Sequence, residues 1–107
     1  MISEDTKQKI IAFRDNRDWK KYHNGKDLAI SISLEANELL ECYQWSADDV
    51  NRTSKIEAIK DELADVLIYC EMFADYYGFD LNEIIDAKLV KNLKKYPAGK
   101  MIDLRNK

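Results

Sequence analysis

Residues that interrupt regular structure are scarce in this sequence. Its 107 residues include one proline and three glycines, and no stretch alternates polar and apolar side chains over a useful length. Because glycine and proline punctuate turns and loops, their scarcity favours long regular segments, and the missing alternation argues against a half-buried sheet. We therefore predict an all-α fold.

Cysteine and long apolar runs are equally limited. Cys42 and Cys70 both fall within helical patterns, so we interpret them as reduced, packed thiols and not as a disulfide framework. No apolar run approaches the roughly 20 residues of a membrane span or the shorter core of a signal peptide. The chain starts with a polar segment, and we expect a cytoplasmic protein without a membrane partner.

An excess of positive charge is also absent. The chain carries 17 basic and 20 acidic residues, mixed along its length, for a net charge of −3. Such a mixture offers no basic stripe to neutralise a phosphate backbone, so we expect no nucleic acid polymer as a partner. Apolar side chains make up 46% of the residues, which at this length predicts a single domain over residues 1–107 with a modest core.

Two helices are predicted in the first half of the chain, separated by an Asn-Gly pair that breaks the pattern. Ser3 is a suitable N-cap for the first helix, which is expected to end near Asn16. Asp27 is the predicted N-cap of the second helix, which runs from Leu28 to about Gln44.

Two further helices are predicted in the second half. Ser54, followed three residues later by Glu57, forms a capping box for the third helix, and Gly78 is expected to end it. Asp80 gives the same start signal for a fourth helix, which stops before Pro97. Four helices with short connections favour a four-helix bundle.

Apolar positions exceed what one chain of this size is expected to cover. In the third helix they form one stripe at about 100° per residue, which is typical of a core face. Its members are Ile56, Ile59, Leu63, Val66, Cys70, Phe73 and Tyr77. The second helix is apolar on most of its circumference, because Ile30 and Leu34 project away from its main stripe. We therefore expect a homo-oligomer that completes the bundle.

Four acids are arranged in two pairs on the second and third predicted helices. The pairs are Glu35 with Glu38 and Glu62 with Asp65. Their i, i+3 spacing makes the members of each pair neighbours on a helix surface, beside the apolar stripe. All four carboxylates thus face the seam between the helices. Crowded carboxylates repel one another and favour protonated forms unless a cation neutralises them.

A hard divalent cation suits such a site. Ligands that are oxygen only favour Mg²⁺, or Mn²⁺ as a substitute, over Zn²⁺. A di-iron bundle would need Glu-x-x-His pairs, and the single histidine, His23, lies elsewhere. The spacing alone leaves a second interpretation open, in which these acids belong to solvated helix faces. Asp61 and Glu71 are expected to be solvated acids of that kind.

Two blocks of the sequence resemble a known family. SLEANELLE and DELADVLIY match, in order and spacing, the E-x-x-E…E-x-x-D motif of the MazG-like all-α nucleotide pyrophosphohydrolases. RDWKKYH, YQW and KLVKNLKKYP are similar to the dCTP pyrophosphatase branch, so the resemblance covers roughly residues 13–97. It implies an oligomer, with a tetramer favoured over a dimer, that binds Mg²⁺ through the four acids. The implied reaction hydrolyses dCTP or a modified dCTP to the monophosphate and pyrophosphate.

The resemblance also implies a substrate site. Residues expected to line the nucleoside pocket are Trp19, His23, Trp45, Tyr69 and Asn92, and those expected near the triphosphate are Lys88, Lys95 and Tyr96. The tryptophans offer flat faces on which a base can stack. The same side chains also fit plainer roles as core aromatics, a surface histidine and a basic helix end, and the residues alone leave this open.

In the reaction that the resemblance implies, the catalytic roles belong to the acids. The sequence has neither a Ser/His/Asp set nor a glycine-rich phosphate loop. Glu38 is the predicted ligand that doubles as the general base, with Glu41 as a neighbouring candidate. Two alternatives stay open: the same fold acting on another triphosphate, such as dUTP or a damaged purine nucleotide, and a non-catalytic helical interaction module.

Overall fold

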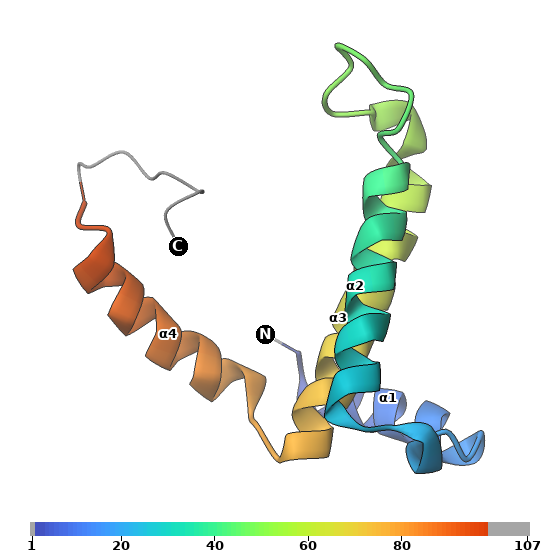
Figure 1. The fold of residues 1–107 in the computed structure, drawn as a ribbon, viewed down its shortest axis with the longest axis vertical. Helices are drawn as coiled ribbons and strands as arrows, with labels where there is room; N and C mark the ends of the chain where they lie inside the picture. Colours follow the sequence, from blue (N-terminus) through green and yellow to red (C-terminus); the bar gives the residue numbers. More distant parts are fainter. Residues whose placement is uncertain (1, 99–107) are drawn as a thin grey trace.

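The fold is entirely helical over residues 2–98, the part of the chain that the computed structural model describes (Figure 1). Its elements are α1 (Glu4–Asn16), η1 (Lys20–Tyr22), α2 (Gly25–Glu41), η2 (Thr53–Lys55), α3 (Ile56–Tyr77) and α4 (Leu81–Lys95), where η marks a 3-10 turn. The all-α class and the four helices are therefore confirmed. None of the described helices combines the length and the apolar content needed to cross a bilayer.

Helices α2 and α3 form the frame of the molecule. They run antiparallel, side by side, as a long hairpin, and α1 lies across the lower part of α3 (Figure 1). Ile10 of α1, Leu28 of α2 and Met72 of α3 are buried together where the three helices meet. Partly buried side chains that pack against them are Ile68, Tyr69 and Phe73. The core is therefore confined to one end of the hairpin, opposite the loop over residues 42–52.

Helix α4 stands apart from the other three. Gly78 ends α3 in the left-handed conformation, with φ of 75°, and α4 then projects away from the hairpin (Figure 1). Exposed apolar side chains of α4 are Ile84, Ile85, Leu89, Val90 and Leu93. On α2, Ile30 and Leu34 are also exposed. A single chain therefore does not close the bundle, and these apolar faces remain for another surface to cover.

Several predicted helix boundaries are confirmed. The Ser3 hydroxyl accepts the Thr6 N–H at 3.1 Å, and α1 ends at Asn16. Asp80 caps α4 by accepting the Glu83 N–H at 3.1 Å. These caps satisfy backbone donors that a helix leaves without internal partners, which is why the short polar side chains recur at these positions.

Two predicted N-caps are wrong. Asn24, and not Asp27, caps α2, because its Oδ1 accepts the Asp27 N–H at 2.8 Å while its own backbone is extended. Ser54 lies within η2, and no side chain of the described residues caps α3. Helix α2 also ends at Glu41 and not near Gln44, because the following residues form tight turns with i to i−3 hydrogen bonds.

The buried face of α3 differs in part from the predicted stripe. Met72 and Ala74 are 1% exposed, whereas Ile56 and Leu63 are 46% and 47% exposed. The physical reason is coverage: α1 reaches only the C-terminal half of α3, and α4 points away from the rest. Both cysteines are free thiols, and each is half-buried, as expected.

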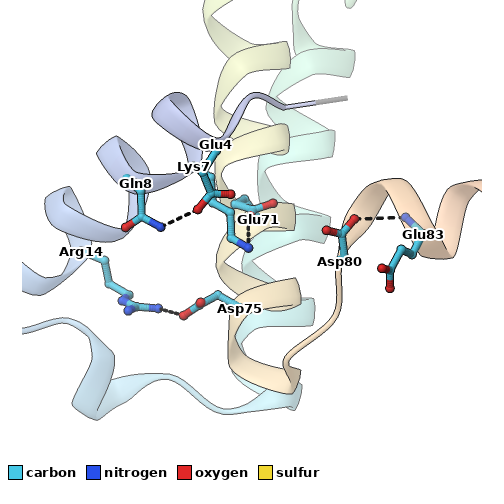
Figure 2. A network of polar contacts seen from close by, with 8 residues as sticks. All are labelled: Glu4, Lys7, Gln8, Arg14, Glu71, Asp75, Asp80 and Glu83. Carbon is cyan, nitrogen blue, oxygen red and sulfur yellow. Dashed lines mark hydrogen bonds and ion pairs between the residues drawn. The ribbon is translucent and has the colours of Figure 1, made fainter.

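Charged side chains join α1 to α3 (Figure 2). Arg14 is 3% exposed and donates hydrogen bonds to Asp75 at 2.6 Å and to Asp15 at 2.9 Å. Glu71 is buried, although we expected it to be solvated, and it pairs with Lys7 at 3.9 Å. Burial raises the pKa of Glu71, and the Lys7 charge opposes that rise. The expectation for Glu71 was wrong because α1 covers this turn of α3.

Candidate metal centre

Three carboxylates converge between α2 and α3. Oxygen atoms of Glu35, Glu62 and Asp65 all lie within 4.8 Å of one another. Glu35 comes from α2, and the other two come from α3, where their i, i+3 spacing places them on one surface. The antiparallel packing of the two helices brings both surfaces to the same level of the hairpin. Three of the four predicted acids therefore form one cluster.

The environment of this cluster disfavours negative charge. Glu35 and Glu62 are half-buried, and the Oε2 atom of each is buried without a hydrogen-bond partner among residues 2–98. The pKa of Glu35 is raised to about 7. Burial is the largest cause, followed by the hydrogen bond with Glu38 and then by the charges of Glu38, Asp65 and Glu62. Burial, followed by the influence of Glu38 and Asp65, also raises the pKa of Glu62.

Glu38 lies at the edge of the acid cluster. It is exposed and outside the set of three, yet its carboxylate raises the pKa of both Glu35 and Glu62. Glu41 is exposed, one turn further along α2, and lines the same groove as Glu38 and Glu62. The roles of Glu38 as fourth ligand and general base, and of Glu41 as its neighbour, stay predictions.

A divalent cation fits the donor set that the cluster provides. Within residues 2–98, no lysine or arginine forms an ion pair with any of these four acids. The two buried Oε2 atoms supply lone pairs without a protein donor, and all the ligand atoms are oxygens, which hard cations prefer. Asp61, by contrast, is exposed, as expected for a solvated acid.

An aromatic pocket of about 220 Å³ flanks the cluster toward the core end of the hairpin. Its lining includes Trp19, Tyr22, His23, Asp27, Leu28, Ser31 and Tyr69. Burial raises the pKa of Tyr69, and the charges of Glu35, Asp65 and Glu38 add to the effect, so this side chain borders both pocket and cluster. The structure thus brings three predicted nucleoside residues together beside the acids. We call this the Tyr69 pocket.

A groove of about 320 Å³ flanks the cluster on the other side. Its lining is Glu38, Glu41, Cys42, Trp45, Arg52, Lys55, Ala58 and Glu62. Trp45 is 80% exposed and belongs to this groove, so it does not share a pocket with Trp19 in one chain. We call this the Trp45 groove.

Sequence reasoning missed the two cations of the Trp45 groove. Arg52 and Lys55 precede α3, in a segment that reads only as a polar connection with a capping box. Arg52 adopts the left-handed conformation, with φ of 46°, and its Nε is buried without a hydrogen-bond partner among residues 2–98. No sequence pattern indicates either feature. The presence of two basic residues just before an acid-bearing helix was the available signal.

The remaining predicted substrate residues lie on or just after α4. Lys88 and Lys95 are exposed, and Asn92 and Tyr96 are half-buried. Because α4 projects away from the hairpin, one chain does not bring these four residues to the acid cluster (Figure 1). Their assignment to a substrate site stays a prediction that needs α4 to meet the cluster of another chain.

Two antiparallel helices that present carboxylates to one point define a class, the α-helical proteins with an acidic site for a divalent cation. The sequence then identifies the family within that class. The profile of the MazG-like family matches residues 30–107, and the chain belongs to this family. The resemblance inferred from the two acid motifs is thereby confirmed.

The chain is similar in sequence to proteins that are named pyrophosphatases. The dCTP pyrophosphatase 1 of Rattus norvegicus is 30% identical over 99 residues, covering 88% of this chain and 58% of that protein. The dCTP pyrophosphatase 1 of Homo sapiens is 31% identical over 100 residues, covering 89% and 59%. The chain therefore spans a little over half of the length of these curated relatives. A crystal structure of a pyrophosphatase from Archaeoglobus fulgidus has a TM-score of 0.78 and 39% identity, covering 84% of this chain and 87% of that one.

The raised pKa of Glu35 predicts how stability depends on pH when a chelator is present. Because the folded state raises this pKa from 4.5 to about 7, folding favours the protonated carboxyl. That contribution is fully present below pH 4.5 and is lost as the pH rises through about 7. We expect the melting temperature in EDTA to fall between pH 5 and pH 8, and Glu35→Gln to reduce this fall.

Glu57→Gln is the matched control, because the Glu57 side chain is 81% exposed and pairs only locally with Lys60. It should leave the pH dependence of the melting temperature as in the wild type. The melting temperatures are measured by circular dichroism. If the melting temperature falls equally in the wild type and in Glu35→Gln, the raised pKa of Glu35 is contradicted.

Proposed function

We propose that this chain is a Mg²⁺-dependent nucleoside triphosphate pyrophosphohydrolase. Its substrate is dCTP or a modified dCTP, and its products are the monophosphate and pyrophosphate, a reaction that cleanses the nucleotide pool. The observation that carries the proposal is the convergence of Glu35, Glu62 and Asp65, with Glu38 beside them. Among residues 2–98, no cationic side chain forms an ion pair with any of the four. The names of the relatives, dCTP pyrophosphatase 1 and pyrophosphatase, agree with it.

The four acids would hold the cation. Glu35 and Glu62 each have a buried oxygen that lacks a hydrogen-bond partner among residues 2–98, which a metal ion would satisfy. Mg²⁺ is favoured by the oxygen-only ligand set, with Mn²⁺ as a substitute. When bound, such an ion neutralises charge on phosphate oxygens as it develops. The raised pKa of Glu35 supports this role, because the carboxylate gains most from a positive neighbour.

The reaction needs a base and a leaving group. A water oxygen attacks the α-phosphorus, the bond from that phosphorus to the bridging oxygen breaks, and its electron pair leaves with pyrophosphate. The proton released by the water passes to a carboxylate. Glu38 is our choice for this base, because it is exposed at the edge of the cluster, and Glu41 is the neighbouring alternative in the same groove.

The nucleoside is assigned to the Tyr69 pocket. Trp19 supplies an aromatic face there, and it is itself held by an edge-to-face contact with Phe13 at 5.4 Å. His23 presents a buried Nδ1 that has no hydrogen-bond partner among residues 2–98, so it can serve a ligand. Burial, with the Arg14 charge, lowers the pKa of His23 and favours a neutral ring. A neutral imidazole can donate or accept a hydrogen bond to a base edge.

Residues on and just after α4 complete the site in an oligomer. Lys88, Asn92, Lys95 and Tyr96 are placed near the substrate only if α4 of one subunit meets the hairpin of another. The exposed apolar side chains of α4 and the exposed Ile30 and Leu34 of α2 support such an assembly. We favour a tetramer over a dimer.

Loss of turnover in amide variants is the first prediction. Glu38→Gln or Asp65→Asn should abolish pyrophosphate release, because each removes a ligand charge, while the helical circular dichroism stays intact. Asp61→Asn is the matched control on the same helix and should keep full activity. Full turnover in both site variants would overturn the metal assignment.

The assembly predicts a particle larger than one chain. Light scattering at micromolar concentration should give a multiple of the 12.5 kDa chain mass. Leu89→Lys, on the exposed face of α4, should lower that mass, because it places a charge where apolar surface is buried. Lys60→Glu is the control, because Lys60 is exposed, and it should leave the measured mass unchanged. A wild-type mass equal to that of a single chain would contradict the proposal.

Base selectivity is the most specific prediction. Cytosine presents an amine donor beside acceptor atoms, and the Asn92 amide can pair with that edge because it both donates and accepts. In a panel of triphosphates with and without Mg²⁺, dCTP should have the highest kcat/KM. An unpaired polar group should reduce the kcat/KM of dTTP or dUTP roughly tenfold to a hundredfold.

Asn92→Ala should narrow these differences in kcat/KM, and so should Trp45→Ala, because in the proposed oligomer Trp45 would reach the base bound to another subunit. Fastest turnover of a purine triphosphate, or an unchanged ranking in both variants, would refute the base assignment while leaving the reaction class intact. The absence of turnover on every triphosphate, with no Mg²⁺ binding, would favour a non-catalytic module.

A further inference from the structure

The acid cluster separates two sites with different linings along the hairpin. The Tyr69 pocket, which is largely aromatic, lies toward the core end, and the Trp45 groove lies toward the loop end. Tyr69 of α3 and Lys55, the residue just before α3, stand on either side of Glu62. Each is seven residues from Glu62, and seven residues span about 10 Å along a helix axis. A ligand that reaches from the Tyr69 pocket across the acids therefore enters the Trp45 groove.

The Trp45 groove contains two cations, Arg52 and Lys55. Within residues 2–98, neither Arg52 nor Lys55 forms an ion pair. The Nε of Arg52 is buried and lacks a hydrogen-bond partner among the same residues. A buried guanidinium nitrogen without an acceptor is unfavourable unless a ligand supplies one.

Hydrogen bonds fix the backbone at Arg52. Its N–H donates to Asp49 Oδ1 at 3.2 Å, and its carbonyl accepts the Lys55 N–H at 2.9 Å. Arg52 itself has φ and ψ of 46°, in the left-handed region that residues other than glycine and asparagine rarely adopt. Such strained positions persist where surrounding contacts enforce them, and they cluster at ligand sites.

We propose that Arg52 and Lys55 form a subsite for the pyrophosphate leaving group. This inference rests on the proposed function, since it places the β- and γ-phosphates of the substrate in the Trp45 groove. The α-phosphate then lies at the acid cluster, and the nucleoside lies in the Tyr69 pocket. The triphosphate extends along the hairpin axis from the core end to the loop end.

The chemistry of the reaction suits this polarity. When the bond to the α-phosphorus breaks, negative charge accumulates on the departing pyrophosphate. A guanidinium that donates two parallel hydrogen bonds matches phosphate oxygens, and an ammonium adds a compact positive charge. The acids cannot stabilise this charge themselves, because Glu38 and Glu62 line the same groove with the same sign. Arg52 and Lys55 supply the opposite sign at the point where the charge develops.

Calorimetric titration with inorganic pyrophosphate, in the presence of Mg²⁺, tests the subsite in the full chain. Arg52→Gln and Lys55→Gln should each weaken pyrophosphate binding about tenfold to a hundredfold, since each removes a charged hydrogen-bond donor. Titration with the nucleoside monophosphate should give the wild-type affinity in both variants, because that product does not reach the groove. Arg52→Lys should recover part of the lost pyrophosphate affinity.

Lys60→Gln is the matched control. Lys60 lies on the same helix as the acids but outside the groove, exposed and paired with Glu57. This variant should bind pyrophosphate as the wild type does. Lys55→Gln leaves the loop residue Arg52 unchanged, so the test survives if Arg52→Gln does not fold.

The outcomes separate this inference from the function on which it rests. If the wild type hydrolyses triphosphates but both glutamine variants keep its pyrophosphate affinity, the subsite is wrong and the proposed function stands. Equal weakening of monophosphate and pyrophosphate binding would also overturn the subsite. If the wild type neither hydrolyses a triphosphate nor binds pyrophosphate, both proposals fail.

Discussion

The antiparallel packing of α2 against α3 is the contact on which the rest of the molecule depends. It buries Leu28 against Met72 at one end and brings Glu35 level with Glu62 and Asp65 further along. Because residues three and four apart share a helix face, the same register serves both apolar and acidic positions. A shift of one helix along the other would therefore both separate the carboxylates and expose the core.

Stability and the candidate chemistry occupy different parts of this hairpin. The core end is held by apolar burial and by the Arg14 pair that joins α1 to Asp75. The middle carries half-buried like charges, and burial, followed by the influence of the neighbouring acids, raises the pKa of Glu35. The charged cluster therefore opposes folding unless a cation neutralises it. The α1–α3 contacts therefore offset a penalty that the site imposes some turns away.

Local signals in the sequence were sufficient for the helices and for most of the acid site. Capping chemistry located α1 and α4 because it acts within one turn, and i, i+3 spacing located the acid pairs for the same reason. Asn24 was missed because Asn and Asp are both good caps, and only the backbone conformation distinguishes them. The burial of Glu71 and the position of α4 were missed because both depend on how the helices pack against one another. The spacing of residues along one helix does not specify that packing.

The two flanking sites show the same limit. Trp19, His23 and Tyr69 were grouped through family resemblance, and the fold brings them to one pocket. Arg52 was missed because its left-handed backbone and its buried Nε arise from the loop as a whole, with no local pattern. Trp45 was assigned with Trp19, yet the length of α2 separates them within one chain.

The confinement of the core to one end of the hairpin has a consequence for how the molecule opens. Amide exchange is slowest where apolar contacts are dense, so protection should be greatest around Leu28 and Met72 and should decline toward the loop. The acid cluster lies between the core end of the hairpin, which opens only on global unfolding, and the loop end, which frays. The cation proposed for this cluster would link α2 to α3 only in the closed form, and it would therefore extend the cooperative unit toward the loop by mass action.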